Sequence, residues 1–206
     1  MQTTSVSKLK KKVGRPKLID REFCLQKVME LYWENGPLGI SVNKICKELK
    51  VSKPAFYREF GSEDLVMAEV LQFYFDNILF SLYTRMYENG SIKSALFYFG
   101  SIAETQKLET SGINGCLFTK MLEDLSYLGP VARAKIVEVN NNLLEMYRTI
   151  IVKAKLTGEL SERHSSEAAC SFLHHQIMTI SAQRARKESP EKISEYAKIA
   201  FSIFNN

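Results

Sequence analysis

A short segment after Val51 places cationic and hydrogen-bonding side chains at helical spacing. Lys53, Pro54, Tyr57 and Arg58 would share one side of a helix, because residues four apart are neighbours on its surface. Two cations and a phenolic hydroxyl on a thin helix can donate hydrogen bonds to base edges and to phosphate oxygens. The segment therefore predicts contact with a nucleic-acid groove.

A second cationic feature lies near the N-terminus. Gly14-Arg15-Pro16 is flanked by lysines at positions 10–12 and 17. The tripeptide is similar to the AT-hook core, in which an extended Gly-Arg-Pro places arginine in a narrow minor groove. We expect Arg15 to do so beside a DNA site; a solvated basic tail is the alternative.

The charge of the chain is concentrated at one end. Of 206 residues, the first 60 contain 13 Lys/Arg and 6 Asp/Glu, whereas the remaining residues contain 15 and 17. A basic end joined to a near-neutral, aromatic-rich remainder predicts a polyanion-binding head on a body with a different role.

The head must hold the cationic segment on short helices. Asp20 is a good N-cap for a helix that ends at Asn35-Gly36-Pro37. Ser41 begins a second helix, and Ser52 begins a third over residues 53–60, with Pro54 in its first turn. So short a third helix needs packing of Ala55, Phe56 and Phe60 against the other two. The order is that of a helix-turn-helix.

Residues 20–66 resemble the DNA-binding domain of the tetracycline-repressor-like (TetR/AcrR) family of bacterial transcription regulators. The matching positions are Ser41, Ile45-Cys46, Val51-Ser52, Tyr57 and Phe60. The resemblance implies an all-α protein, with a three-helix DNA-binding domain and a C-terminal helical domain for ligand binding and dimerisation. It also implies a homodimeric repressor that binds a palindromic operator and is released by a small effector.

The resemblance also assigns DNA contacts residue by residue. Lys53, Pro54, Ala55 and Arg58 would face bases, whereas Ser41, Lys44 and Tyr57 would contact phosphates. Ser52 caps the same helix and is included in the expected surface.

Three residues depart from the family pattern, and one of them, Pro37 in place of a common aromatic residue, changes only a loop. Lys50 replaces the usual turn glycine, which costs about 1 kcal/mol if that position is left-handed. Glu63 replaces a frequent lysine, so the phosphate contact usually made there is in doubt, although an acidic first turn suits a helix N-terminus.

The remaining chain is predicted to consist of long helices. The expected ranges are residues 63–87, 92–104, a helix ending near Gly129-Pro130, 131–155, 166–187 and 190–204. The helix over 63–87 is apolar on nearly every side and should be surrounded by protein. We divide the chain into a basic arm (1–19), a DNA-binding domain (20–66) and a ligand-binding and dimerisation domain (67–206).

The last two helices have apolar residues on more than one face. In the helix over 190–204, Ile193, Ala197 and Phe204 form one side, whereas Ile199 and Ile203 lie elsewhere. One face suits the core and the other favours a partner, so a homodimer through residues 166–187 and 190–204 is expected.

Aromatic and thioether side chains of the body could line an apolar effector pocket. Most such residues are ordinary core, and both interpretations stay open at each position. The candidate ligand contacts are Phe73, Phe80, Phe97, Cys116, Met121, Tyr147, His174 and Met178.

Cys116 lies in a Gly-Cys-Leu segment that resembles the N-ethylmaleimide-repressor branch of the family. At a helix N-terminus near Lys120, its thiolate would be stabilised and reactive towards electrophiles. A buried structural cysteine is the alternative.

Several function classes are disfavoured by the sequence. There is no catalytic triad spacing, zinc-protease motif or phosphate-binding loop, so no enzyme, cofactor or metal site is predicted. The four cysteines lie at least 22 residues apart, which favours a reducing cytoplasm over a disulfide framework. The apolar stretch 65–83 contains Glu69 and Asp76 and is interpreted as a core helix rather than a membrane span. The alternative function is a helix-turn-helix factor of chromosome organisation or division that responds to no small inducer.

Overall fold

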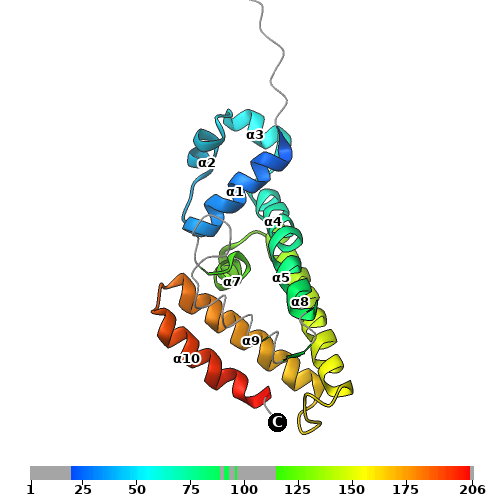
Figure 1. Cartoon of the computed structure of the whole chain (residues 1–206). Coiled ribbons are helices and arrows are strands. Elements are labelled where there is room, and N and C mark those ends of the chain that lie inside the picture. Colours follow the sequence, from blue (N-terminus) through cyan, green and yellow to red (C-terminus); the bar gives the residue numbers. More distant parts are fainter. Residues whose placement is uncertain (1–19, 89–90, 93–95, 97–114, 205–206) are drawn as a thin grey trace, which may run out of the picture.

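The computed structural model describes residues 20–88, 91, 92, 96 and 115–204, and every regular element among them is helical (Figure 1). Arg15, Phe97 and most of the helix predicted over 92–104 lie outside these residues. The all-α prediction is confirmed. The elements are α1 (Arg21–Asn35), α2 (Val42–Leu49), α3 (Lys53–Phe60), α4 (Glu63–Tyr74), the π-helix η1 (Phe75–Leu79), α5 (Phe80–Glu88), α7 (Leu117–Glu123), η2 (Leu125–Tyr127), α8 (Pro130–Leu156), α9 (Ser166–Ala185), α10 (Pro190–Phe201) and η3 (Ser202–Phe204).

The head begins each helix on a side-chain cap. The Asp20 carboxylate accepts a hydrogen bond from the Phe23 amide at 3.1 Å, and the hydroxyls of Ser41, Ser52 and Ser62 accept equivalent bonds at the starts of α2, α3 and α4. These acceptors satisfy amides that the helices leave unpaired. The predicted boundaries of the first three helices are therefore confirmed, and α3 begins and ends at the predicted residues.

A continuous helical run, α4–η1–α5, joins the head to the body. The α4 part packs against α1 and α8, whereas η1 contains no buried residue, and Phe80 in α5 is 51% exposed. The prediction that this whole helix is surrounded by protein is therefore wrong for η1 and for part of α5. The π-helical turn inserts an extra residue per hydrogen-bonded ring, which rotates α5 relative to α4 and turns Phe80 outwards.

The run Glu63–Glu88 has the length and hydropathy of a membrane span, and it is the one such helix among the described residues. One third of its most apolar window is buried inside the protein, chiefly in the α4 half. A core helix of a globular protein meets the same two criteria.

The N-terminus of α8 is fixed to the start of α4 by a carboxylate. Asp64 accepts hydrogen bonds from the amides of Val131 at 2.9 Å and Ala132 at 2.8 Å. A side chain on Gly129 would approach the Asp64 carboxylate to about 2.3 Å, so only glycine allows this close contact. The orientation of α4, and with it the head, is thereby coupled to α8.

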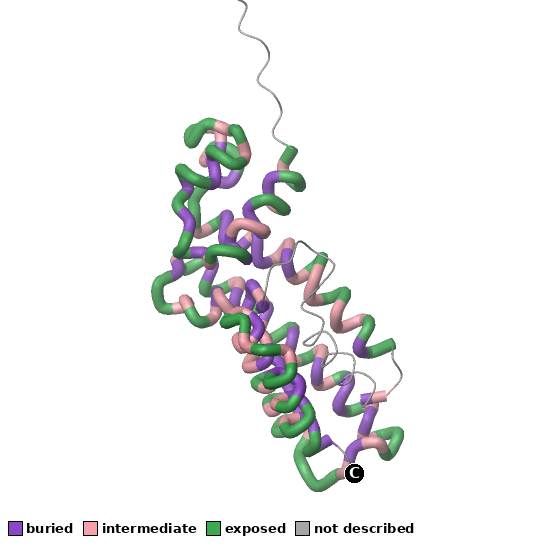
Figure 2. Tube along the Cα trace, turned by 60° about the vertical axis from the view of Figure 1, so that its left-hand side comes forward, coloured by how far each residue is buried: buried purple, intermediate pink, exposed green. Residues whose placement is uncertain are grey.

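The body is a bundle in which α8 lies between α4 and α9, and α10 lies against α9 (Figure 1). The predicted apolar face of α8 is buried, including Ile136, Val139, Leu143 and Tyr147. Figure 2 shows the buried residues along the inner sides of the long helices and the exposed ones on their outer sides. On α10, Ile193 and Ala197 are buried, whereas Ile199 is 68% exposed.

Candidate nucleic-acid interface and internal cavity

The outer side of α3 is a cationic surface. Lys53, Pro54 and Arg58 are exposed and Ala55 is half-buried, whereas Phe56 and Phe60 are buried and pack together with ring centroids 5.0 Å apart. The Lys53 ammonium lies 5.8 Å from the centroid of the Tyr57 ring. Because the aromatic anchors face inwards, the cations must face solvent.

The turn between α2 and α3 contributes further exposed donors. Lys50 has φ 55° and ψ 37°, the left-handed conformation for which glycine is favoured, at a cost of about 1 kcal/mol for lysine. Ser41 and Lys44 are both exposed at the start of α2, where the Ser41 hydroxyl accepts from the Lys44 amide. Ser52 caps α3, so its oxygen is occupied by the Ala55 amide, while its hydroxyl hydrogen can still be donated.

Two acidic side chains limit this surface. The Tyr57 hydroxyl donates a hydrogen bond to the Glu63 carboxylate at 2.8 Å, and this bond raises the pKa of Tyr57. The Glu59 carboxylate lies 3.8 Å from the Arg21 guanidinium. Tyr57 can reach a phosphate only by sharing or leaving the Glu63 contact.

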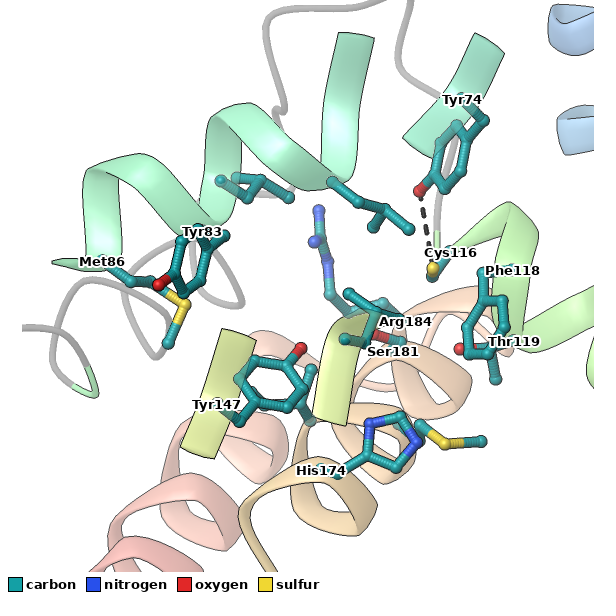
Figure 3. A pocket seen from close by; sticks show the side chains of 16 residues that line it. Tyr74, Tyr83, Met86, Cys116, Phe118, Thr119, Tyr147, His174, Ser181 and Arg184 are labelled. Carbon is teal, nitrogen blue, oxygen red and sulfur yellow. Dashed lines mark hydrogen bonds between the residues drawn. The ribbon is translucent and has the colours of Figure 1, made fainter. Parts of the chain in front are cut away.

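A cavity of about 690 Å³, counting the space at its mouth, lies in the body (Figure 3). Four of the eight candidate ligand residues are on its wall, namely Cys116, Tyr147, His174 and Met178. The described lining consists of Tyr74, Leu79, Leu82, Tyr83, Met86, Gly115, Cys116, Phe118, Thr119, Leu143, Tyr147, His174, Ile177, Met178, Ser181 and Arg184.

Three candidate ligand residues do not line this cavity. Phe73 and Phe80 each lie next to a wall residue along the helix, Tyr74 and Leu79, and neighbours on a helix point about 100° apart. Met121 is completely buried in the core. These three residues stay predicted ligand contacts that this cavity does not include, and Phe97 lies outside the described residues.

The polar atoms of the cavity wall are few. His174 is 4% exposed; its Nε2 lies 3.0 Å from the Asn140 side-chain oxygen, and its Nδ1 has no partner among the described residues. Burial lowers the pKa of His174 to about 4, so the imidazole is neutral near pH 7. Arg184 is 9% exposed, and burial lowers its pKa too, although a guanidinium stays charged.

Cys116 connects the cavity to the start of α7. It is the N-cap residue of α7 and is half-buried, and the Tyr74 hydroxyl donates to its sulfur at 3.4 Å. The Lys120 ammonium donates to the backbone oxygen of Trp33 instead of pointing at the thiol, and burial lowers the pKa of Lys120. The thiol-sensor interpretation of Cys116 stays a prediction.

The cavity wall is joined to the head through the single tryptophan. Trp33 in α1 is fully buried, donates from its indole to the Gly115 oxygen at 3.1 Å, and meets the Tyr74 ring edge-on at 5.0 Å. A movement of Tyr74 or of the Gly115-Cys116 segment would therefore shift α1 directly through these contacts with Trp33.

Comparison with known proteins gives the family. Residues 25–70 match the family described as bacterial regulatory proteins, tetR family. This stretch of the chain therefore matches a tetR-family domain. The chain is 26% identical to the HTH-type transcriptional repressor ComR of Escherichia coli (strain K12), over 96% of this chain and 94% of ComR.

Solved tetR-family structures have the same fold. A structure of CifR complexed with 26-bp operator DNA superposes with a TM-score of 0.75 at 19% identity, covering 90% of this chain and 97% of CifR. The reduced form of E. coli NemR gives a TM-score of 0.72 at 17% identity, covering 89% and 96%. ComR is described as a transcriptional repressor and CifR as a transcriptional regulator, a class that is not enzymatic.

Three residues of the site were missed by sequence reasoning: Trp33, Gly115 and Arg184. A signal for Arg184 was available, because His174, Ile177, Met178, Ser181 and Arg184 follow one helical face. A cation that continues an apolar stripe indicates an interior charge. Nothing in the sequence pairs Trp33 with Gly115, 82 residues away.

The neutral His174 makes the stability of the protein sensitive to acid. Its pKa is lower in the folded than in the unfolded chain, so the contribution is complete above about pH 6.5 and is lost as the pH falls towards about 4. We expect this group alone to remove about 3 kcal/mol of unfolding free energy over that range. His174→Gln keeps a donor for Asn140 and should flatten the pH profile measured by denaturant unfolding.

His164, which is exposed, provides the matched control. His164→Gln should leave the difference between pH 7 and pH 4.5 unchanged. A profile for His174→Gln that parallels the native one would contradict the assignment.

Proposed function

We propose that this tetR-family chain is a cytoplasmic transcriptional repressor that binds a palindromic operator as a homodimer and is released by a small effector. The observation that carries the proposal is the exposed cationic side of α3, with Lys53 and Arg58 outward and Phe56 inward. A helix of this diameter fits the major groove, where arginine and lysine read guanine edges. The candidate contacts remain Ser41, Lys44, Ser52, Lys53, Pro54, Ala55, Tyr57 and Arg58, with Arg15 of the arm in the minor groove.

The homodimer is supported by the outer faces of the last two helices. Ile199 is 68% exposed and Ile203 40%, and Phe172 and Tyr196 are half-buried beside the α9–α10 core. Apolar side chains on the outer surface of a helical pair favour a second copy, and a two-fold axis there would present two α3 helices to one duplex.

Effector release is supported by the connection between the cavity and the head. Tyr74 and Gly115 line the cavity and also contact Trp33 of α1. A ligand that shifts either residue changes the position of α1, and the spacing of the two α3 helices with it. This connected cavity favours an inducible repressor over a chromosome-organising factor that needs no inducer.

The proposal is tested with purified protein and the DNA upstream of its own gene. We expect protection of one symmetric site whose half-sites lie about one helical turn apart, and a dimer by light scattering at micromolar concentration. Folded protein that ignores this DNA at low ionic strength, or that remains monomeric, would contradict it. Protection of many dispersed sites across the genome would favour the chromosome-organising alternative.

A further inference from the structure

Arg184 is the one formally charged side chain among the described residues of the cavity wall. It is 9% exposed, and its Nη2 atom is buried without a hydrogen-bond partner among those residues. In Figure 3 the guanidinium extends from α9 into the space between Tyr83 and Tyr74. Buried cations are ordinarily paired with an anion, so an unpaired one aimed into a cavity indicates a missing partner.

No carboxylate occurs among the described lining residues. The polar groups there are the hydroxyls of Tyr74, Tyr83, Tyr147, Thr119 and Ser181, the Cys116 thiol and the neutral His174 imidazole. None of these carries a compensating negative charge in its ordinary neutral form. Among the described wall residues, an anion brought by a ligand would therefore meet one cation and no opposing carboxylate.

The rest of the described wall is apolar. Leu79, Leu82, Met86, Leu143 and Ile177 surround the cavity together with aromatic rings. Such a lining favours burial of a hydrocarbon body, because removing apolar surface from water is favourable. The described wall of the cavity thus combines the Arg184 cation with hydrophobic side chains.

We propose that the effector is a small amphipathic monocarboxylate, with its carboxylate paired to Arg184 and its hydrocarbon body against the apolar wall. A guanidinium matches a carboxylate with two parallel N–H···O bonds. This inference rests on the proposed function and specifies its ligand class. Aliphatic and aromatic acids both combine a carboxylate with a hydrocarbon body, and the experiment below distinguishes between them.

The position of Arg184 also explains how such a ligand would act. In Figure 3 Arg184 lies between the Tyr74 and Tyr147 sides of the cavity, and Tyr74 and Cys116, which are hydrogen-bonded to each other, both interact electrostatically with its guanidinium. A carboxylate placed there competes for the Tyr74 hydroxyl and displaces the ring that contacts Trp33. Pairing at Arg184 is therefore converted into a movement of α1.

The experiment compares acids with neutral molecules of the same shape. The full-length protein is titrated with octanoate and 1-octanol, and with 4-phenylbutanoate and 4-phenylbutanol, at pH 7.5. Binding is followed by calorimetry and by the fluorescence of Trp33, the single tryptophan. We expect at least one acid to bind more tightly than its alcohol and to release operator DNA. The acid that binds more tightly identifies the hydrocarbon body as aliphatic or aromatic.

Arg184→Met tests the charge at nearly constant side-chain volume. We expect acid affinity to fall about 10- to 100-fold, because hydrogen bonds to charged groups contribute about 1.5–3 kcal/mol, and alcohol affinity to be kept or improved. Arg184→Lys should lose less, since the charge is kept. Arg186→Met is the matched control, because Arg186 is exposed just beyond α9.

Acid binding that is equal in native protein and Arg184→Met overturns the inference, as does native protein that prefers neither acid to its alcohol. If Arg184→Met does not fold, the comparison of acids with alcohols on native protein still tests whether the cavity prefers a carboxylate. Operator binding by ligand-free protein is measured in the same samples. Native protein that binds operator but prefers neither acid to its alcohol rejects the ligand class alone, whereas native protein that does not bind operator rejects the proposed function.

Discussion

Replacing Arg58 with alanine is expected to weaken operator binding by about 30-fold to 25,000-fold. A guanidinium that reads a base edge contributes about 1–3 kcal/mol per contact, and a homodimer loses the contact in both half-sites. Arg58 is exposed in the last turn of α3 and makes no hydrogen bond or ion pair with another described residue. Fluorescence anisotropy with the footprinted operator measures the loss.

The control for Arg58→Ala is Arg163→Ala, which removes the same charge from the exposed segment between α8 and α9. The control should bind operator like native protein, and both variants should unfold within about 0.5 kcal/mol of it, as exposed substitutions generally do. If Arg58→Ala binds operator within twofold of the Arg163→Ala control, α3 does not lie in the groove as proposed.

Glu63→Gln gives a change of opposite sign at the same surface. It removes a negative charge beside the expected phosphate contact, while the amide oxygen can still accept from the Tyr57 hydroxyl. We expect tighter operator binding for Glu63→Gln and weaker binding for Arg58→Ala. The two signs together separate a specific docking surface from a general loss of folded protein.

The head was predictable because its determinants are local. Asp20, Ser41 and Ser52 are N-cap residues that mark where helices begin. Phe56 and Phe60 are close enough in sequence to define the inner side of α3. The cost predicted for a left-handed lysine at position 50 applies, because Lys50 has that conformation where the family usually has glycine. Each feature depends on neighbours within one or two helical turns.

The cavity was only partly predictable because its wall is defined by contacts between distant segments. Tyr147 and His174, for example, lie on different helices. The sequence also does not distinguish an aromatic residue that lines a cavity, such as Tyr74, from one that points to solvent, such as Phe80, because both occur at helical spacing. The rotation introduced by η1 decides between these outcomes. No residue in the sequence marks that π-helical turn.

Gly115→Ala is expected to lower the unfolding free energy by about 2–5 kcal/mol, and the melting temperature by about 5–20 °C. Gly115 has φ +83°, which costs an L-residue about 1–2 kcal/mol. A Cβ there would lie 2.7 Å from the Ala185 Cβ and 3.0 Å from the Ser181 oxygen, which adds overpacking of about 1–3 kcal/mol. Differential scanning calorimetry measures the shift.

Gly158→Ala separates the two causes within the same protein. Gly158 has φ +74°, but no atom lies within 4 Å of a Cβ placed there. It should therefore show the backbone cost alone, and the difference between the variants isolates the packing of Gly115 against α9. Equal destabilisation would mean that this segment relaxes away from α9 without cost. That outcome would contradict a rigid contact between Gly115 and α9. It would therefore also contradict the proposed coupling from the effector cavity through Trp33 to the DNA-binding head.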